Sequence, residues 1–229
     1  MTLRILLILF VLASLAGAQT GSDIASHPHY HSLLENDQVR VYSLTLHPTE
    51  EAYVRHEHSF LTVTLEDCEV VLWQGTQSAI QHFQVHEGEV GFVFVSAPKA
   101  AGIRNVSQSE YRNITVEFLD PKFGWAAPNG GGIGPPPDRR AKFSDSIVLG
   151  GANVADVQLL AGDSLTTPKR GVAELFIAVS EVELTGAGDL SIRKSPGAVA
   201  WLPPGRKSDL VNAASGPAHF VIVEIQPAD

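Results

Sequence analysis

Two histidines separated by one residue are the strongest sign of chemistry in this sequence. His56-Glu57-His58 ends a strand-like stretch in the first half of the chain. On a β-strand, residues i and i+2 point to the same face, so the two imidazoles would lie side by side. Imidazole is a common ligand of zinc and of other first-row metals. The pair therefore predicts a site for one divalent metal ion.

A metal held by this pair needs further ligands. Catalytic first-row metals usually take three or more protein ligands and keep an open position for water or substrate. The candidates for a third ligand are His86, His82, Glu66 and His47. Two interpretations stay open: a divalent metal site that is weak or absent, and a complete site with an unusual third ligand.

The stretches that must position these side chains alternate between apolar and polar residues with a period of two. Ile114, Val116 and Phe118, for example, alternate with Thr115 and Glu117. This pattern is typical of half-buried β-strands. It recurs at 39–41, 61–65, 157–159, 175–179, 182–184, 199–201 and 220–225. Turn-forming residues separate the runs at intervals of about ten residues, as in a sandwich or barrel. The sequence predicts an all-β protein.

The two halves of the chain resemble each other in three segments that follow in the same order. Residues 65–72 resemble 179–184, residues 86–92 resemble 195–201, and residues 104–118 resemble 211–225. Such repetition indicates an internal duplication. Between the copies, residues 121–142 have the Gly- and Pro-rich composition of a linker. We expect one domain over 19–120 and a second over 143–229.

The first 18 residues have the pattern of a secretory signal peptide. Arg4 precedes an apolar run from Ile5 to Leu12, and small residues end the segment at Ala18. The run is too short to span a bilayer, and no membrane span is expected in the mature chain. We expect cleavage near Ala18 and a secreted or periplasmic protein.

Composition narrows the classes of partner. The chain carries 16 Lys and Arg against 25 Asp and Glu, a formal charge of −9, and loss of Arg4 with the signal peptide makes it more negative. An acidic protein repels phosphate backbones, so no nucleic-acid partner is expected. Cys68 is the single cysteine, which excludes an intramolecular disulfide. We expect its side chain to be buried as a small apolar group.

The order of these motifs resembles the cupin superfamily, and the duplication is similar to that of bicupins. The resemblance covers about 33–118 and 144–226, and its best match runs from Pro203 to Asn212, which follows the second cupin motif P-x-G-x-x-H-x-x-x-N. Ser208 stands at the His position of that motif. The resemblance implies two tandem cupin-type antiparallel β-barrels of the RmlC-like jelly-roll type, each with room inside for side chains or one small ligand.

The resemblance also implies a degenerate metal site. His56 and His58 match the HxH of the first cupin motif, but the glutamate expected four or five residues later is Thr62 or Val63, and the last histidine ligand is Ala101. Residues 166–171 replace HxH in the second copy. Two family ligands remain in the first barrel and none in the second.

Three functional hypotheses follow. The first is a secreted or periplasmic protein that binds a small molecule, or weakly a divalent metal, without strong catalysis. The second is a metal-dependent dioxygenase or isomerase that uses His56 and His58 in the first barrel. The third is an interaction module whose second barrel forms a homo-oligomer. The sequence has neither a G-x-S-x-G elbow nor a Walker loop, no other cofactor is expected, and whether the protein is an enzyme stays open.

Overall fold

The structure is a computed structural model that describes residues 21–75, 81–120, 142–149, 152–167, 171–186, 190–205 and 208–225. The described residues form two compact units, one up to residue 120 and one from residue 142. The predicted signal peptide at 1–18 and nearly all of the predicted linker at 121–142 lie outside the described residues. Their boundaries stay predictions.

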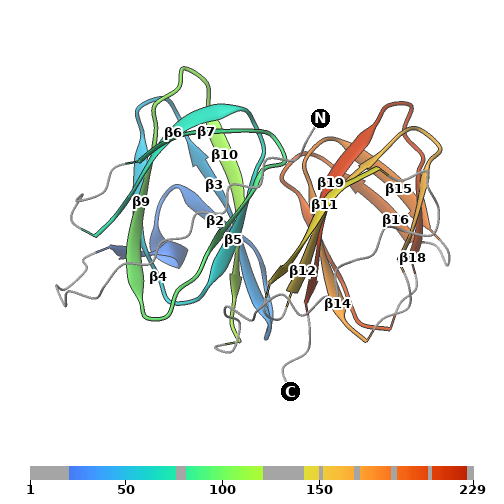
Figure 1. The fold of residues 1–229 in the computed structure, drawn as a ribbon, viewed down its shortest axis with the longest axis horizontal. Coiled ribbons are helices and arrows are strands. Elements are labelled where there is room, and N and C mark those ends of the chain that lie inside the picture. The colour runs from blue at the N-terminus through green and yellow to red at the C-terminus, as the bar shows by residue number, and fades with distance from the viewer. Residues whose placement is uncertain are drawn as a thin grey trace. The chain divides into compact units, whose positions relative to one another are not determined.

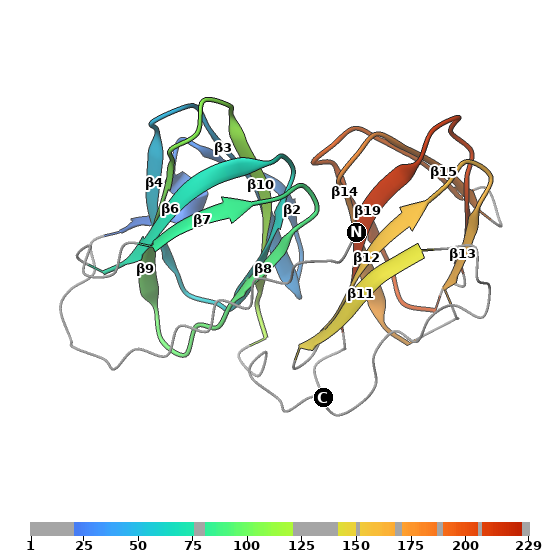
Figure 2. The same ribbon diagram turned by 45° about the horizontal axis from the view of Figure 1, so that its top comes forward.

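The first unit is built from ten strands in two sheets. The strands are β1 (Ser22–Asp23), β2 (Tyr30–Glu35), β3 (Val39–Leu46), β4 (Glu51–His56), β5 (Phe60–Thr64), β6 (Cys68–Gln74), β7 (Gln81–Val85), β8 (Val90–Val93), β9 (Lys99–Asn105) and β10 (Tyr111–Phe118). One sheet has the order β1-β4-β9-β6-β7 and the other β2-β3-β10-β5-β8 (Figure 1). All pairs are antiparallel except β1 with β4. Figure 2 shows the edge strand β7 beside β6.

The second unit repeats this architecture without the short β1. Its strands are β11 (Lys142–Leu149), β12 (Ala152–Leu159), β13 (Ser164–Thr167), β14 (Ala173–Ala178), β15 (Val182–Gly186), β16 (Leu190–Lys194), β17 (Val199–Leu202), β18 (Ser208–Asn212) and β19 (Ala218–Ile225). The sheets run β11-β12-β19-β14-β17 and β13-β18-β15-β16. Each strand therefore has the same neighbours as its counterpart in the first unit. The predicted all-β class with two tandem jelly-roll barrels is confirmed, while the duplication event itself stays a prediction.

The segments that resemble each other in sequence also make the same local contacts. Asn105 and Asn212 each donate from Nδ2 to a carbonyl at the end of the equivalent strand, Leu46 O and Leu159 O, both at 3.0 Å. Each also donates to the carbonyl four residues further along the chain. These bonds satisfy a buried amide and fix the loop that follows β9 or β18.

Two glycines hold equivalent turns before β8 and β17. Gly88 and Gly197 have φ of 77° and 84°. Both donate a backbone N–H at 2.8 Å, to Thr64 O and Ala178 O respectively. The left-handed backbone suits glycine, which lacks a Cβ. The match between residues 86–92 and 195–201 therefore reflects a shared turn.

Helical structure among the described residues is limited to one 3₁₀ turn, η1 (Ile24–Ser26), whose Ile24 is buried in the first barrel's core. No helix formed by these residues has the length and apolar character needed to cross a membrane. Cys68 is buried, as expected, and its thiol lies 2.8 Å from Ser107 Oγ.

The interiors of the two barrels differ in chemistry although their registers agree. In the first barrel, β10 and β5 pair Asn113 with Thr64 and Thr115 with Thr62. The equivalent cross-strand pairs in the second barrel are Phe220 with Ala178 and Ile222 with Phe176, all buried. The rings of Phe176 and Phe220 lie 4.6 Å apart within the apolar core of that unit. Large apolar side chains fill the second barrel where the first has polar ones.

The sequence predicted that β10 is half-buried, but both of its faces are buried in the structure. Thr115 and Glu117, expected on a polar face, are as fully buried as Ile114 and Val116 on the opposite face. Both faces of this central strand are covered, and the polar side chains find partners inside the barrel. An alternating pattern identifies a strand but does not by itself identify which face is interior.

Candidate functional site: a cavity in the first barrel

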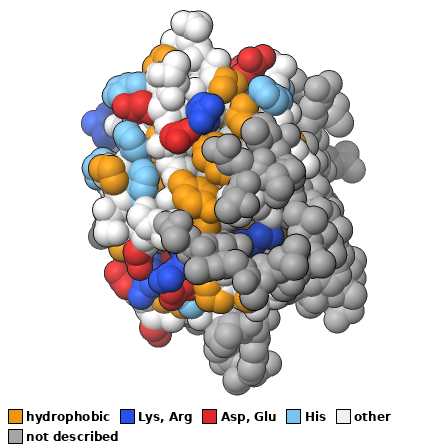
Figure 3. Space-filling model, turned by 90° about the vertical axis from the view of Figure 1, so that its left-hand side faces the viewer, with side chains coloured by type: hydrophobic (Ala, Val, Ile, Leu, Met, Phe, Trp, Pro, Cys, Tyr) orange, Lys and Arg blue, Asp and Glu red, His pale blue; other side chains and the backbone are white. Residues whose placement is uncertain are grey.

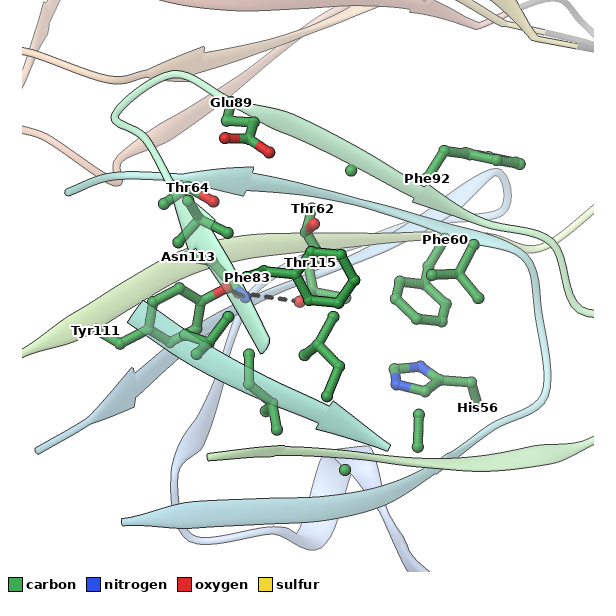
Figure 4. A pocket seen from close by; sticks show the side chains of 18 of the residues that line it. His56, Phe60, Thr62, Thr64, Phe83, Glu89, Phe92, Tyr111, Asn113 and Thr115 are labelled. Carbon is green, nitrogen blue, oxygen red and sulfur yellow. Dashed lines mark hydrogen bonds between the residues drawn. The ribbon is translucent and has the colours of Figure 1, made fainter. Parts of the chain in front are cut away.

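A cavity of about 110 Å³ lies inside the first unit. Side chains from both sheets line it, with β5, β8 and β10 on one side and β4, β6, β7 and β9 on the other. In Figure 4, His56 and Phe60 lie at one end, Tyr111 and Asn113 at the other, and Thr62 between them.

Two aromatic rings, those of Phe60 and Phe83, project into the cavity. Trp73 also borders it, but its indole lies on the outer face of the sheet, stacked on Tyr53 and close to Arg104. The indole of Trp73 lies across Gly102, its cross-strand partner, where a Cβ would come within 1.9 Å of the ring. Glycine at this position therefore sets the place of the indole. Rings in a confined site provide a large apolar contact area for an occupant.

A buried pair of His56 and Glu117 supplies the principal polar group at one end. His56 Nδ1 lies 3.0 Å from Glu117 Oε1, and the two residues are 3% and 2% exposed. His56 comes from the end of β4 and Glu117 from β10, so the contact joins the two sheets. The His56 ring also stacks on Phe60, with ring centroids 3.9 Å apart.

The Glu117 contact sets the orientation of the imidazole. A carboxylate accepts a hydrogen bond from a protonated Nδ1. Nε2 is then the nitrogen that remains available to an occupant. No residue in the described part of the chain makes a hydrogen bond with Nε2. The same arrangement orients histidine in catalytic triads and behind metal ligands. His56 is thus an oriented imidazole at the wall of an apolar cavity.

The opposite end holds a polar cluster whose members satisfy one another. Asn113 Nδ2 donates to Tyr111 Oη at 2.8 Å, and Thr115 Oγ1 donates to Asn113 Oδ1 at 3.2 Å (Figure 4). Burial raises the pKa of Tyr111 to about 12, against the lowering effect of hydrogen bonds with Asn113 and Thr64. Burial also raises the pKa of Tyr30, with smaller contributions from Tyr111 and Glu117. Both phenols stay neutral at ordinary pH.

Two further polar side chains reach the cavity. Glu89 is 7% exposed and accepts the backbone N–H of His86 at 3.0 Å. Burial raises the pKa of its carboxyl, and the hydrogen bond and charge of His86 oppose that rise. Gln74 Oε1 is buried and has no hydrogen-bond partner among the described residues. The Gln74 amide oxygen is therefore an acceptor that an occupant can use.

His58 does not lie beside His56 on a strand. β4 ends at His56, and His58 is half-buried in the bend that leads to β5. The period-two argument therefore does not apply to His58, and the residue that shares the face of His56 along β4 is the buried Val54. His58 is not part of the cavity wall.

The four candidates for a third ligand also lie away from the cavity wall. His82 and His47 are exposed, and His47 Nδ1 lies 3.3 Å from Glu110. His86 Nδ1 lies 3.5 Å from Asp67, while Glu66 accepts from Arg112 at 3.0 Å. Figure 3 shows histidines at the surface of the first unit, interspersed with acidic and basic side chains.

The donor set around His56 does not fit a first-row metal. Among the described residues, no three His, Cys, Asp or Glu side chains are grouped to hold a metal ion. Thr62 and Ala101, at positions where the cupin resemblance expects a glutamate and a histidine, both line the cavity. A hydroxyl and a methyl group do not replace a carboxylate and an imidazole as ligands.

The sequence reasoning did not identify Glu117, Asn113 or Glu89 as site residues. A signal for Glu117 is present in the sequence: Glu117 and Glu224 interrupt apolar runs at equivalent positions of β10 and β19. Glu224 is also buried and accepts from Asn153 at 3.1 Å. A charged residue repeated inside two buried strands is a candidate for a specific partner.

Comparison with known proteins identifies the fold. Neither a protein-family model nor a curated protein matches the chain. AerE from Microcystis aeruginosa matches with a TM-score of 0.59 and 11% identity, over 88% of this chain and 99% of its own. A cupin 2 conserved barrel domain protein from Leptotrichia buccalis gives 0.54 and 13%, over 90% and 91%. Salicylate 1,2-dioxygenase from Pseudoaminobacter salicylatoxidans with gentisate gives 0.62 and 11%, over 90% and 75%.

These likenesses define the class of structure. The chain has the cupin fold, present as two jelly-roll barrels in tandem. The resemblance drawn from the sequence motifs is confirmed at the level of fold. Identities of 11–13% leave the activity to be argued from the site.

Proposed function

We propose that the first barrel binds one small, largely apolar molecule, with the His56–Glu117 pair as its polar anchor and without a resident metal. The observation that carries this proposal is a 110 Å³ cavity containing one oriented imidazole and no cluster of metal ligands among the described residues. Ligand sites commonly combine apolar walls with a few placed polar groups.

The difference between the barrels supports placing the site in the first one. Both have the same strand order, yet Phe176 and Phe220 occupy interior positions in the second barrel where the first has Thr62 and Asn113. The smaller polar side chains leave space in the first barrel. The second barrel has the role of a scaffold in this proposal.

The similar structures support the size of the occupant. One of the matching structures is a dioxygenase with gentisate, a molecule with a single six-membered ring. An engineered apolar cavity of roughly 150 Å³ holds benzene, and the cavity of about 110 Å³ is of the same order. A ring-sized molecule is therefore the natural probe.

Ligand-observed NMR with toluene tests the proposal. We expect toluene to bind the wild-type protein with a Kd of about 1 mM or tighter. Thr62→Phe, which introduces the residue found at the equivalent position of the second barrel, should weaken binding at least tenfold. Thr185→Phe, at an exposed strand position of the second unit, is the matched control and should bind as wild type. Absence of binding by toluene and by its polar analogues phenol and benzoate to the wild-type protein would refute the proposal.

The alternative is a metal-dependent dioxygenase or isomerase with His56 and His58 as ligands. It requires His58 to move to the cavity and a third ligand to join. Elemental mass spectrometry decides between the two: we expect well below one metal ion per chain after dialysis. A near-stoichiometric metal that is lost in His56→Ala/His58→Ala would establish the metal site and overturn the metal-free proposal.

Export and self-association are separate proposals. The N-terminal pattern supports secretion or export to a periplasm, and a mature protein that begins near Gln19 in intact-mass analysis would confirm cleavage. A homo-oligomer predicts a concentration-dependent mass in light scattering. A constant monomer mass would remove the interaction-module hypothesis.

A further inference from the structure

We infer that the occupant of the first barrel's cavity is a neutral, single-ring molecule that carries a hydroxyl group, and that this hydroxyl pairs with Nε2 of His56. This inference rests on the proposed function and adds the chemical class of the ligand. Simple phenols are the class that meets its requirements.

The charges at the cavity disfavour an anion. No Lys or Arg is among the residues that line it, whereas Glu89 lies in the wall and Glu117 lies directly behind His56. A carboxylate ligand would lose its hydration and gain no cationic partner other than a protonated His56. A neutral molecule avoids that desolvation cost.

The polar atoms left without partners specify a hydrogen-bonding group. Tyr111, Asn113 and Thr115 use one another, so they do not require a ligand. His56 Nε2 and Thr62 Oγ1 are polar atoms of the wall that make no hydrogen bond with the described residues, and Gln74 Oε1 is buried without one. A ligand that pairs with one of these atoms must donate or accept a hydrogen bond.

A hydroxyl fits both protonation states of the imidazole. When His56 is neutral with its proton on Nδ1 toward Glu117, Nε2 accepts the hydroxyl proton in a hydrogen bond. When His56 is an imidazolium, Nε2–H donates to the hydroxyl oxygen. An ether or ketone satisfies only the second state. Glu117 acts as the positioning residue in both, because it holds the ring through Nδ1.

The walls specify the remainder of the molecule. Phe60 already stacks on the His56 ring, and Phe83 lies along the same cavity. Figure 4 shows Phe60 beside His56 at one end of the cavity, so a planar ring next to Phe60 can place a hydroxyl at the imidazole. Offset-stacked and edge-to-face arrangements of aromatic rings add to simple burial. The space inside the cavity accommodates about one ring.

The test compares phenol, toluene and benzoate on the wild-type protein and on His56→Leu/Glu117→Leu. The double variant removes the imidazole without leaving a buried carboxylate unpaired. We expect phenol to lose about tenfold in affinity on passing to the double variant, a factor within the range of one hydrogen bond, while toluene changes less than twofold. Benzoate should bind the wild-type protein at least tenfold more weakly than phenol. His82→Leu, an exposed position outside the cavity, is the control and should change none of these affinities.

If the double variant does not fold, a second measurement on the wild-type protein tests the same inference. In wild-type protein labelled with ¹⁵N-histidine, phenol should shift the Nε2 resonance of His56, and toluene should shift it much less. The hydroxyl inference would be overturned if phenol and toluene lost affinity equally in the double variant, or if they shifted the His56 resonance equally. Toluene binding would still support the proposed function in that case. Benzoate binding as tight as phenol would overturn the requirement for a neutral ligand. Failure of all three probes to bind would overturn the proposed function itself.

Discussion

Separating the two members of the His56–Glu117 pair is expected to cost far more stability than removing both. Each residue is almost fully buried, and the 3.0 Å contact bridges the two sheets of the first barrel. His56→Leu removes the donor and leaves the Glu117 carboxylate in an apolar interior. Breaking a buried pair from one side costs about 3–5 kcal/mol in general. The stacking neighbour Phe60 does not replace the lost donor.

Glu117→Leu and the double variant complete a double-mutant cycle that gives the coupling energy between His56 and Glu117. Glu117→Leu leaves Nδ1 of a neutral imidazole without its acceptor, which costs about 1–3 kcal/mol. His56→Leu/Glu117→Leu buries two apolar side chains in place of the pair and should cost about 1 kcal/mol or less. The two single losses together therefore exceed the double loss, and the coupling energy should be about 3–7 kcal/mol.

Urea unfolding of the four proteins measures this cycle. His82→Leu, an exposed histidine on β7, should change the free energy of unfolding by less than about 0.5 kcal/mol. A coupling energy below about 0.5 kcal/mol would show that the pair does not exist in solution, and the ligand argument would lose its anchor.

Three further predictions concern the polar groups of the barrels. Asn105→Ala and Asn212→Ala should each lower the free energy of unfolding by about 2–4 kcal/mol, as measured in urea, because both amides satisfy buried carbonyls; a loss below 0.5 kcal/mol would contradict this. Tyr111→Phe should cost about 1–2 kcal/mol in the same assay, since Asn113 Nδ2 loses its acceptor, and an unchanged value would refute that hydrogen bond. Burial raises the pKa of Glu89, so its contribution to stability is present at low pH and is lost as pH rises through the folded pKa. The melting temperature of Glu89→Gln relative to wild type should therefore increase from pH 4 to pH 8, and a decrease would show that the carboxylate is stabilised.

The strand pattern and the repeated turns could be predicted from the sequence because they depend on neighbouring residues. Alternation identified β5 and β10, and the glycine turn before β8 has its equivalent before β17. These features need only local backbone geometry and the preferences of Gly, Asn and Pro. The fold class follows from their order.

The site could not be predicted in the same way because it depends on long-range contacts. His56 meets Glu117 across 61 residues, and nothing near either residue indicates the other. The strand ends before His58, so the side-by-side geometry expected from the sequence does not apply, and a sequence pattern places such a boundary only within a few residues. β10 was predicted to be half-buried, whereas both of its faces are buried. A strand can be recognised from neighbouring residues, whereas the composition of a barrel interior depends on residues that are far apart in the sequence.

The persistence of the cavity is itself an argument for a ligand. A pocket of about 110 Å³ gives up the packing contacts that a filled interior would make. The second barrel shows that the same topology can fill these positions, with Phe176 at the position equivalent to Thr62. Because a filled interior was compatible with the fold, the open one is explained most simply by an occupant.

Thr62→Phe distinguishes an open ligand site from an interior that is already fully packed. The added ring should raise the free energy of unfolding by about 0.5–2 kcal/mol, the usual gain from filling a cavity, while toluene affinity falls at least tenfold. The gain is expected because Thr62 makes no hydrogen bond that the substitution would break. Stability measured in urea and affinity measured by NMR must change in opposite directions for a ligand site. A variant that loses more than about 1 kcal/mol would show that the interior is already fully packed there, and the stability argument for an occupant would fail.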